Sequence, residues 1–277
     1  MCNTVGHVIM TLAEGEPIRG VATLGKHHYV LRGPKSSEQI EVYDITTFRL
    51  LNRVSVPGLG DASDIVACKH YCCAYTCGTS SQYVYRMSSI NYNELTQWSV
   101  NDGPTCLSIT IKYSVLVTCR KVRKMKEFTT DGRLLRQVVL CVPSPWHTVQ
   151  LSGGDLMVCH GHTGEPLHRV CLMNSGGQVI KSFYGGNKGS SSSQMNTPCH
   201  MAVDENESVF VVDRNNCAVL LLSPALRDVR KAVSSDKLKW TPYRLCLDAE
   251  RRRLYVAVNE RLKVGDFTAG RVIVVNV

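Results

Sequence analysis

The chain has 277 residues and a formal net charge of +9, with 44% hydrophobic and 20% charged residues. This composition is typical of a folded protein and excludes a disordered, collagen-like or coiled-coil chain. No apolar run reaches the roughly 20 residues that span a bilayer, and the first residues lack the pattern of a secretory signal. We therefore expect a cytoplasmic protein with no membrane partner and with its 13 cysteines kept as thiols.

In chain order, segment 7–12 has strand character and precedes a block that recurs along the chain. The block is a proline, any residue, a polar residue and then a short apolar strand. Its copies begin near residues 17, 62, 104, 145, 198 and 242, and the copy at 62 lacks the proline. A period of about 40–45 residues with only strands inside is typical of a β-propeller blade. The one longer interval holds the Gly/Ser-rich segment 185–193, which we interpret as a surface loop.

Each copy contains further strands, with apolar inner strands and alternating outer ones, as expected when the middle of a blade is buried on both faces. The sixth copy stops after its third strand, at 271–275. Because an open sheet edge is a liability, we predict that segment 7–12 pairs beside 271–275 and closes the ring. The predicted fold class is all-β, a six-bladed propeller of four-stranded blades, with residues 1–277 forming a single domain.

The fifth copy carries the clearest motif, PCHMAVD at 198–204 followed by VFVVDRNNCAV at 209–219. These segments resemble the NHL repeat, in which a P-x-[H/G]-[I/V]-A-V-D strand precedes a Y-V-A-D-x-x-N-x-R-V segment. The fourth and sixth copies keep the first half of this motif, and Cys217-Ala218 departs from the expected arginine. The WD40 repeat is disfavoured because Gly-His and Trp-Asp pairs do not fall at its places.

The resemblance implies a domain similar to the C-terminal NHL domain of tripartite-motif proteins. It implies a monomeric, non-enzymatic module that recruits a protein or peptide, in ubiquitin ligation beside a separate RING protein. Some such domains bind RNA, which stays open as an alternative partner. No G-x-S-x-G, P-loop or H-E-x-x-H motif occurs. We therefore expect no catalytic residues, no cofactor and no enzyme, and keep a metal-dependent propeller lyase or hydrolase as a distant alternative.

The third residue of each block begins the innermost strand, so repeat phase predicts a ring of these residues around one mouth of the channel. They are Arg19, Asp64, Cys106, His147, His200 and Arg244. Two arginines and two histidines favour an anion such as a phosphate, whereas polar residues lining a water-filled channel are the simpler interpretation. Zinc needs three or four close ligands, and the ring offers two histidines, so we expect no metal.

A basic and aromatic face is the second candidate, on loops that share a side of the ring with that mouth. Its members are Arg120, Lys121, Arg123, Lys124, Lys126, Trp146, Arg214 and Tyr243. Cations neutralise a phosphate backbone and aromatic rings stack on bases, so this composition fits RNA. A hairpin with solvated basic residues is the alternative.

Overall fold

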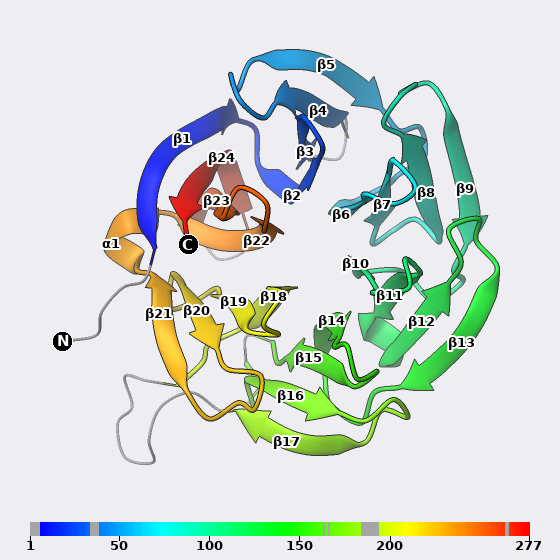
Figure 1. Cartoon of the computed structure of the whole chain (residues 1–277), viewed down its shortest axis with the longest axis vertical. Coiled ribbons are helices and arrows are strands. Elements are labelled where there is room, and N and C mark those ends of the chain that lie inside the picture. The colour runs from blue at the N-terminus through cyan, green and yellow to red at the C-terminus, as the bar shows by residue number, and fades with distance from the viewer. Residues whose placement is uncertain (1–5, 34–38, 163, 166, 184–193, 264–265) are drawn as a thin grey trace.

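The structure is a computed structural model of the chain, and it describes residues 6–33, 39–162, 164–165, 167–183, 194–263 and 266–277. The described strands form six four-stranded antiparallel sheets, arranged as blades around a central channel (Figure 1). This arrangement confirms the predicted six-bladed, all-β propeller. The predicted loop at 185–193 lies outside the described residues.

Within each blade the four strands follow one another from the channel outward in chain order, except in the last blade, where β1 is outermost. The innermost strands are β2 (Ile18–Leu24), β6 (Ala62–Cys68), β10 (Cys106–Ile109), β14 (Pro145–Gln150), β18 (Pro198–Val203) and β22 (Thr241–Asp248). The second strands are β3 (His27–Arg32), β7 (Cys73–Gly78), β11 (Val115–Cys119), β15 (Leu156–His160), β19 (Val209–Asp213) and β23 (Arg253–Lys263).

The outer half of each blade completes the sheet. The third strands are β4 (Gln39–Asp44), β8 (Tyr83–Ser88), β12 (Lys124–Phe128), β16 (Arg169–Met173), β20 (Ala218–Leu222) and β24 (Asp266–Asn276). The outermost strands are β5 (Leu50–Ser55), β9 (Leu95–Ser99), β13 (Leu134–Val139), β17 (Val179–Phe183), β21 (Val229–Val233) and β1 (His7–Gly15). Two short helices complete the described structure, η1 (Arg120–Val122) and α1 (Ser235–Leu238).

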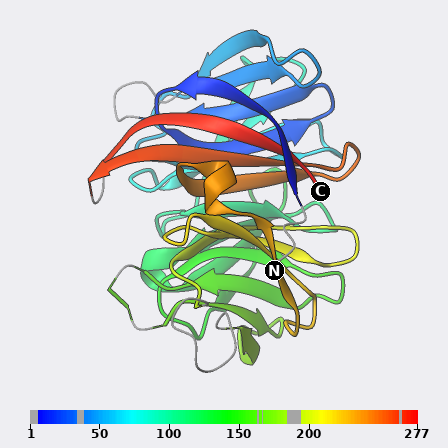
Figure 2. The ribbon, with the colours of Figure 1, turned by 90° about the vertical axis from the view of Figure 1, so that its left-hand side faces the viewer.

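The last blade is built from both ends of the chain. Strand β1 pairs with β24 in the register Thr11 to Ile273 and Leu12 to Val272, as predicted (Figure 1). Leu12 is buried against apolar residues of β24, so the contact covers the edge that β24 would otherwise expose. Strands β23 and β24 are eleven residues long, and Figure 2 shows their hairpin projecting past the neighbouring blades.

Burial follows position in the blade. All five residues of β11 are buried, whereas β13 is largely exposed. The apolar clusters lie between neighbouring blades, and free cysteines such as Cys77 and Cys119 pack there as small hydrophobic side chains. No helix in the described part of the chain is long and apolar enough to span a membrane.

Candidate functional site

The innermost strand of five blades carries a β-bulge near its start. The strand pairing skips one residue in each case: Arg19 in β2, Ser63 in β6, Trp146 in β14, Cys199 in β18 and Tyr243 in β22. A bulge leaves the extra residue unpaired and re-aims its side chain. The side chains of the bulged residue and of the next residue therefore lie in different places, although the two residues are neighbours in sequence. Ser63, Trp146 and Tyr243, for example, line a pocket, whereas the residues that follow them are buried in the channel.

The first blade departs from the predicted ring. Ile18 pairs with Arg32 and Gly20 pairs with Leu31, so Gly20 occupies the place that Asp64 and His200 hold in their blades. Arg19 is the bulged residue, and its guanidinium carbon lies 5.9 Å from the centroid of the Phe267 ring. The prediction that Arg19 joins the ring is wrong, because alignment on the proline put the block one residue out of register.

Four of the remaining predicted residues form what we call the channel network: Asp64, His147, His200 and Arg244. His200 Nε2 lies 3.3 Å from Asp64 Oδ2, and Arg244 Nε lies 3.4 Å from Asp64 Oδ1. The rings of His147 and His200 stack with centroids 4.1 Å apart. All four side chains are buried, and so is Cys106, which corrects the expectation of an exposed mouth. Burial also raises the pKa of the Cys106 thiol, so it is protonated at neutral pH.

The channel network ties neighbouring blades together. Asp64 Oδ2 accepts a hydrogen bond from the Leu107 amide of the next blade at 2.9 Å. His147 Nδ1 accepts from the Met201 amide at 3.1 Å, and His200 Nδ1 accepts from the Leu245 amide at 3.5 Å. In each of these hydrogen bonds the acceptor side chain belongs to the third residue of one sequence block. The donor amide belongs to the residue that directly follows the third residue of the next block. These contacts satisfy backbone groups that the channel would otherwise leave unpaired.

The charges of the channel network balance within it. Burial lowers the pKa of His147 to about 3, and burial also lowers the pKa of His200 although Asp64 opposes this shift. Burial alone would raise the pKa of Asp64, but His200 and Arg244 hold it at about 2. At neutral pH the network is therefore an ion pair between Asp64 and Arg244 with two neutral histidines.

Asp64, His147 and His200 lie close enough together to be considered as a metal site. A histidine binds a metal through a free nitrogen lone pair. His147 Nδ1 already accepts from Met201, so its Nε2 carries the proton and donates to the Leu107 carbonyl oxygen at 2.9 Å. His200 Nδ1 is likewise occupied, and its Nε2 faces Asp64. With Arg244 also beside the carboxylate, these three residues do not fit a metal ion.

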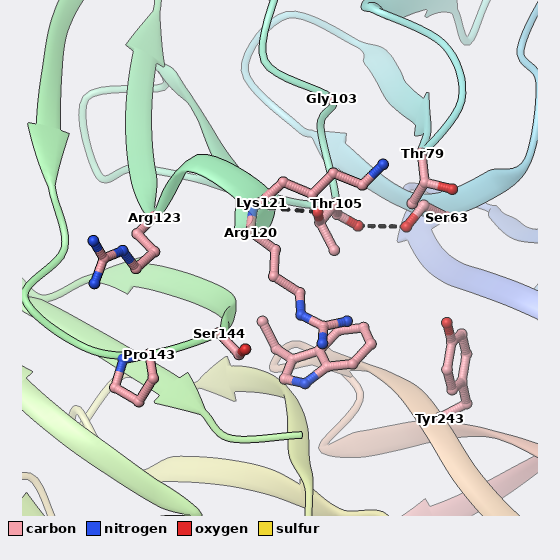
Figure 3. Close-up of a pocket in the computed structure, with 11 residues that line it drawn as sticks. Ser63, Thr79, Gly103, Thr105, Arg120, Lys121, Arg123, Pro143, Ser144 and Tyr243 are labelled. Carbon is pink, nitrogen blue, oxygen red and sulfur yellow. Dashed lines mark hydrogen bonds between the residues drawn. The ribbon is translucent and has the colours of Figure 1, made fainter. Parts of the chain in front are cut away.

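A separate pocket of about 600 Å³ opens on the side of the ring that carries the loops between second and third strands (Figure 3). We call it the top-face pocket. Its lining residues are Ser63, Thr79, Gly103, Thr105, Arg120, Lys121, Arg123, Pro143, Ser144, Trp146 and Tyr243. No aspartate or glutamate is among the described residues that line it. Its volume suits a small organic ligand, and its cations and hydroxyls suit an anion.

Helix η1 divides the basic segment of the third blade. Arg123 adopts a left-handed conformation with φ of 53°, which ends η1 after one turn. Arg120 and Lys121 therefore extend over the pocket, whereas the Arg123 side chain points away from it (Figure 3). The Arg120 guanidinium carbon lies 4.0 Å from the centroid of the Trp146 ring, a cation–π contact.

Ser144 is the pocket hydroxyl that contacts a carboxylate. It has a φ of 39°, and its Oγ lies 2.5 Å from Glu165 Oε1. Glu165 Oε2 accepts a second hydrogen bond, from the His162 amide at 2.9 Å. Burial alone would raise the pKa of Glu165, but these hydrogen bonds and the charge of Arg120 lower it below its ordinary value. Glu165 is therefore ionised at neutral pH and accepts the Ser144 hydrogen bond.

The predicted basic and aromatic face is only partly assembled. Trp146 and Tyr243 are 7% and 9% exposed, and Arg214 lies over the Tyr243 ring at 5.3 Å. Lys126 and Lys124 instead approach Asp102, at 2.7 and 3.8 Å. The two lysines were predicted to extend the basic face, but strand β12 directs their ammonium groups to this carboxylate.

Sequence reasoning missed several residues of the pocket: Ser63, Thr79, Thr105, Ser144 and, beside them, Glu165. Ser63, Thr105, Trp146 and Tyr243 share one signal, since each is the second residue of its block. Attention to that position would have found one wall of the pocket. The Ser144–Glu165 contact joins the loop before β14 to the loop after β15, 21 residues apart, and has no such signal.

No protein-family model matches the sequence, and no curated protein matches it. Solved structures do match. The PQQ-bound aldose sugar dehydrogenase of Streptomyces coelicolor is 14% identical with a TM-score of 0.69, over 99% of this chain and 100% of that one. Virginiamycin B lyase of Staphylococcus aureus is 7% identical with a TM-score of 0.64, over 96% and 98%. Kuenenia stuttgartiensis hydrazine synthase is 12% identical with a TM-score of 0.62, over 91% and 94%.

At these identities the similarity establishes the propeller fold. It also corrects two expectations from sequence, a protein-recruiting module of the tripartite-motif kind and the absence of enzyme activity. The finding that overturns them is that these propellers, matched along nearly their whole length, are a dehydrogenase, a lyase and a synthase.

Proposed function

We propose that this propeller is an enzyme that hydrolyses an ester of a small anionic molecule bound in the top-face pocket. Ser144 is the nucleophile in this proposal, and Glu165 accepts its proton. The observation that carries it is the 2.5 Å contact between Ser144 and Glu165 beside a cationic pocket. A serine hydroxyl becomes an effective nucleophile when an adjacent base takes its proton. The positive φ of Ser144 adds a strained backbone, a feature that clusters at active sites.

The reaction follows from the groups in place. Arg120 and Lys121 attract the anion, and Ser144 Oγ forms a bond to the ester carbonyl carbon while its proton passes to Glu165. The ester C–O bond then breaks, and the leaving oxygen takes that proton. A water molecule, which gives a proton to Glu165, hydrolyses the acyl-serine and restores both groups. The charge of Arg120 stabilises the negative charge that develops on the carbonyl oxygen.

The other candidates are less well supported. The predicted RNA surface needs exposed rings for base stacking, but Trp146 and Tyr243 are buried and have arginines over their faces. The metal-dependent form of the enzyme is disfavoured because His147 and His200 have committed their nitrogens. The NHL character of the repeats and a cytoplasmic location remain part of the proposal, resting on the sequence.

A fluorophosphonate probe tests the proposal, because it reacts with activated serines. We expect stoichiometric labelling of Ser144, located by peptide mass spectrometry, and none in Ser144→Ala. Glu165→Gln should slow labelling at least about tenfold, since general-base catalysis contributes factors of this order or larger. Ser152→Ala is the matched control, an exposed serine in another loop of the same blade, and should label normally. Absence of labelling in the native protein, or its persistence in Ser144→Ala, would overturn the proposal.

A further inference from the structure

Cationic side chains gather around the top-face pocket, and among the described residues they outnumber the nearby counter-charge, Glu165, which acts on Arg120. Arg120, Lys121 and Arg123 line it, and Arg19 and Arg214 lie beside it, on Phe267 and Tyr243. In the described part of the chain, none of these five forms a salt bridge. By contrast, the buried Arg244 has Asp64, and Lys124 and Lys126 share Asp102. Cations held together without partners repel one another, so an anion that binds here relieves that repulsion.

Two of these cations are fixed on the aromatic walls of the pocket. Arg120 lies over Trp146 at 4.0 Å, and Arg214 lies over Tyr243 at 5.3 Å, each distance taken from the guanidinium carbon to the ring centroid. Arg120 and Tyr243 are on opposite sides of the pocket (Figure 3). Stacking on a ring occupies a face of a guanidinium and leaves the N–H groups at its edge free to donate.

Both guanidiniums lie on rings that line the same pocket, Trp146 for Arg120 and Tyr243 for Arg214. Burial lowers the pKa of Arg120, and the positive charge of Arg214 contributes to the same shift. Arg214 Nε is buried and has no hydrogen-bond partner among the described residues. Lys121 extends above the same space toward Thr79 (Figure 3). Arg120, Lys121 and Arg214 therefore offer cationic donors from different walls of the pocket.

We infer that the anionic group recognised in the top-face pocket is a phosphate, held between Arg120 and Arg214 with Lys121 above it. A carboxylate has two oxygens and one charge, and a single arginine fork satisfies it, whereas a phosphate monoester offers three oxygens and nearly two charges. The inference rests on the proposed function for the use of this pocket, and it names the substrate class as small phosphorylated esters. The covered aromatic faces favour a small molecule over the backbone of RNA.

Calorimetric titration with a matched pair of ligands tests this inference. Phenyl phosphate and benzoate share a ring and differ in the anionic group. We expect phenyl phosphate to bind at least about tenfold more tightly than benzoate, because it engages a second guanidinium. Arg120→Ala and Arg214→Ala should each weaken phenyl phosphate about tenfold or more, with thermal melting to confirm folding. Arg120→Lys keeps the charge but loses the fork and should also weaken binding.

The control is Arg133→Ala, an exposed arginine between β12 and β13 of the same blade that does not line the pocket, and it should bind normally. Equal affinity for benzoate, an equal loss in Arg133→Ala, or binding of oligouridylate without phenyl phosphate would overturn the inference. Two different readouts separate this test from that of the proposed function. Phenyl phosphate affinity measures recognition of the anion, and fluorophosphonate labelling measures the reactivity of Ser144, so either result can fail without the other.

Discussion

The channel network and the top-face pocket are built from adjacent residues of the same strands, yet their electrostatics are opposite. Ser63, Trp146 and Tyr243 line the pocket, and their successors Asp64, His147 and Arg244 are buried below it. In the network the charges balance and the nitrogens are committed. In the pocket the cations have no salt-bridge partners among the described residues. A polar group that is already satisfied holds the fold, whereas one that lacks a partner is available to a ligand.

Among the variants that test this contrast, removal of Arg244 should cause the largest loss in the free energy of unfolding. Arg244→Met leaves Asp64 buried without its cation and the Ser63 carbonyl oxygen without its 2.8 Å donor. Breaking a buried ion pair in this way costs about 3–5 kcal/mol, which urea unfolding would measure. Arg123→Ala, at the exposed rim of the pocket, should change the free energy of unfolding by less than about 0.5 kcal/mol. A loss in Arg244→Met as small as in the control would mean that the network does not stabilise the ring.

Lowering the pH should reduce the free energy of unfolding through the buried histidines before it changes the pocket. Burial lowers the pKa of His28 and of His147 to about 3 in the folded chain, so the unfolded chain binds more protons between about pH 6.5 and pH 3. Stability is therefore full above that range and falls as the pH is lowered. We expect these two histidines to cost about 4 kcal/mol of stability between pH 7 and pH 5, measured by denaturant unfolding at each pH.

The variant that checks this slope is His28→Phe, which keeps a ring stacked on Tyr255 and removes one titrating group. His28→Phe should make the free energy of unfolding less dependent on pH, and it should leave the affinity for phenyl phosphate unchanged. Burial raises the pKa of Asp213 to about 6, so this carboxyl acts in the opposite direction and limits the total. An identical slope in His28→Phe would show that His28 is not the group that titrates.

A smaller effect should come from Gly20, which takes the ring position predicted for Arg19. A Cβ at Gly20 would lie 2.7 Å from both the backbone nitrogen and Cγ2 of Ile65 in the next blade. Gly20→Ala should therefore cost about 1–2 kcal/mol of stability through overpacking. Gly153→Ala is the matched control, because no heavy atom lies within 4 Å of its added Cβ. Equal melting temperatures of the two variants would contradict the close approach of the first two blades.

The sequence predicts the fold well because blade number, strand order and ring closure all depend on repeat period and apolar pattern. The site depends on finer features. In the first blade the bulge falls two residues after the proline instead of one, so Gly20 takes the ring position, and no local residue type marks that shift. Likewise the basic residues from 120 to 126 look equivalent in sequence. In the structure, Arg120 in η1 lines the pocket, whereas Lys126 in β12 forms a salt bridge with Asp102. Whether a charged side chain forms a salt bridge depends on how the strands pack in three dimensions, which the local sequence does not encode.

The pairing of β1 with β24 has a consequence for the order of events during synthesis. Strand β1 leaves the ribosome before its partner β24, which follows more than 250 residues later. At about 5–20 residues per second, β1 waits at least 10 seconds with Ile9, Met10 and Leu12 unpaired. The first five blades can form as they emerge, whereas the sixth must wait for β24, so translation itself times the closing of the ring.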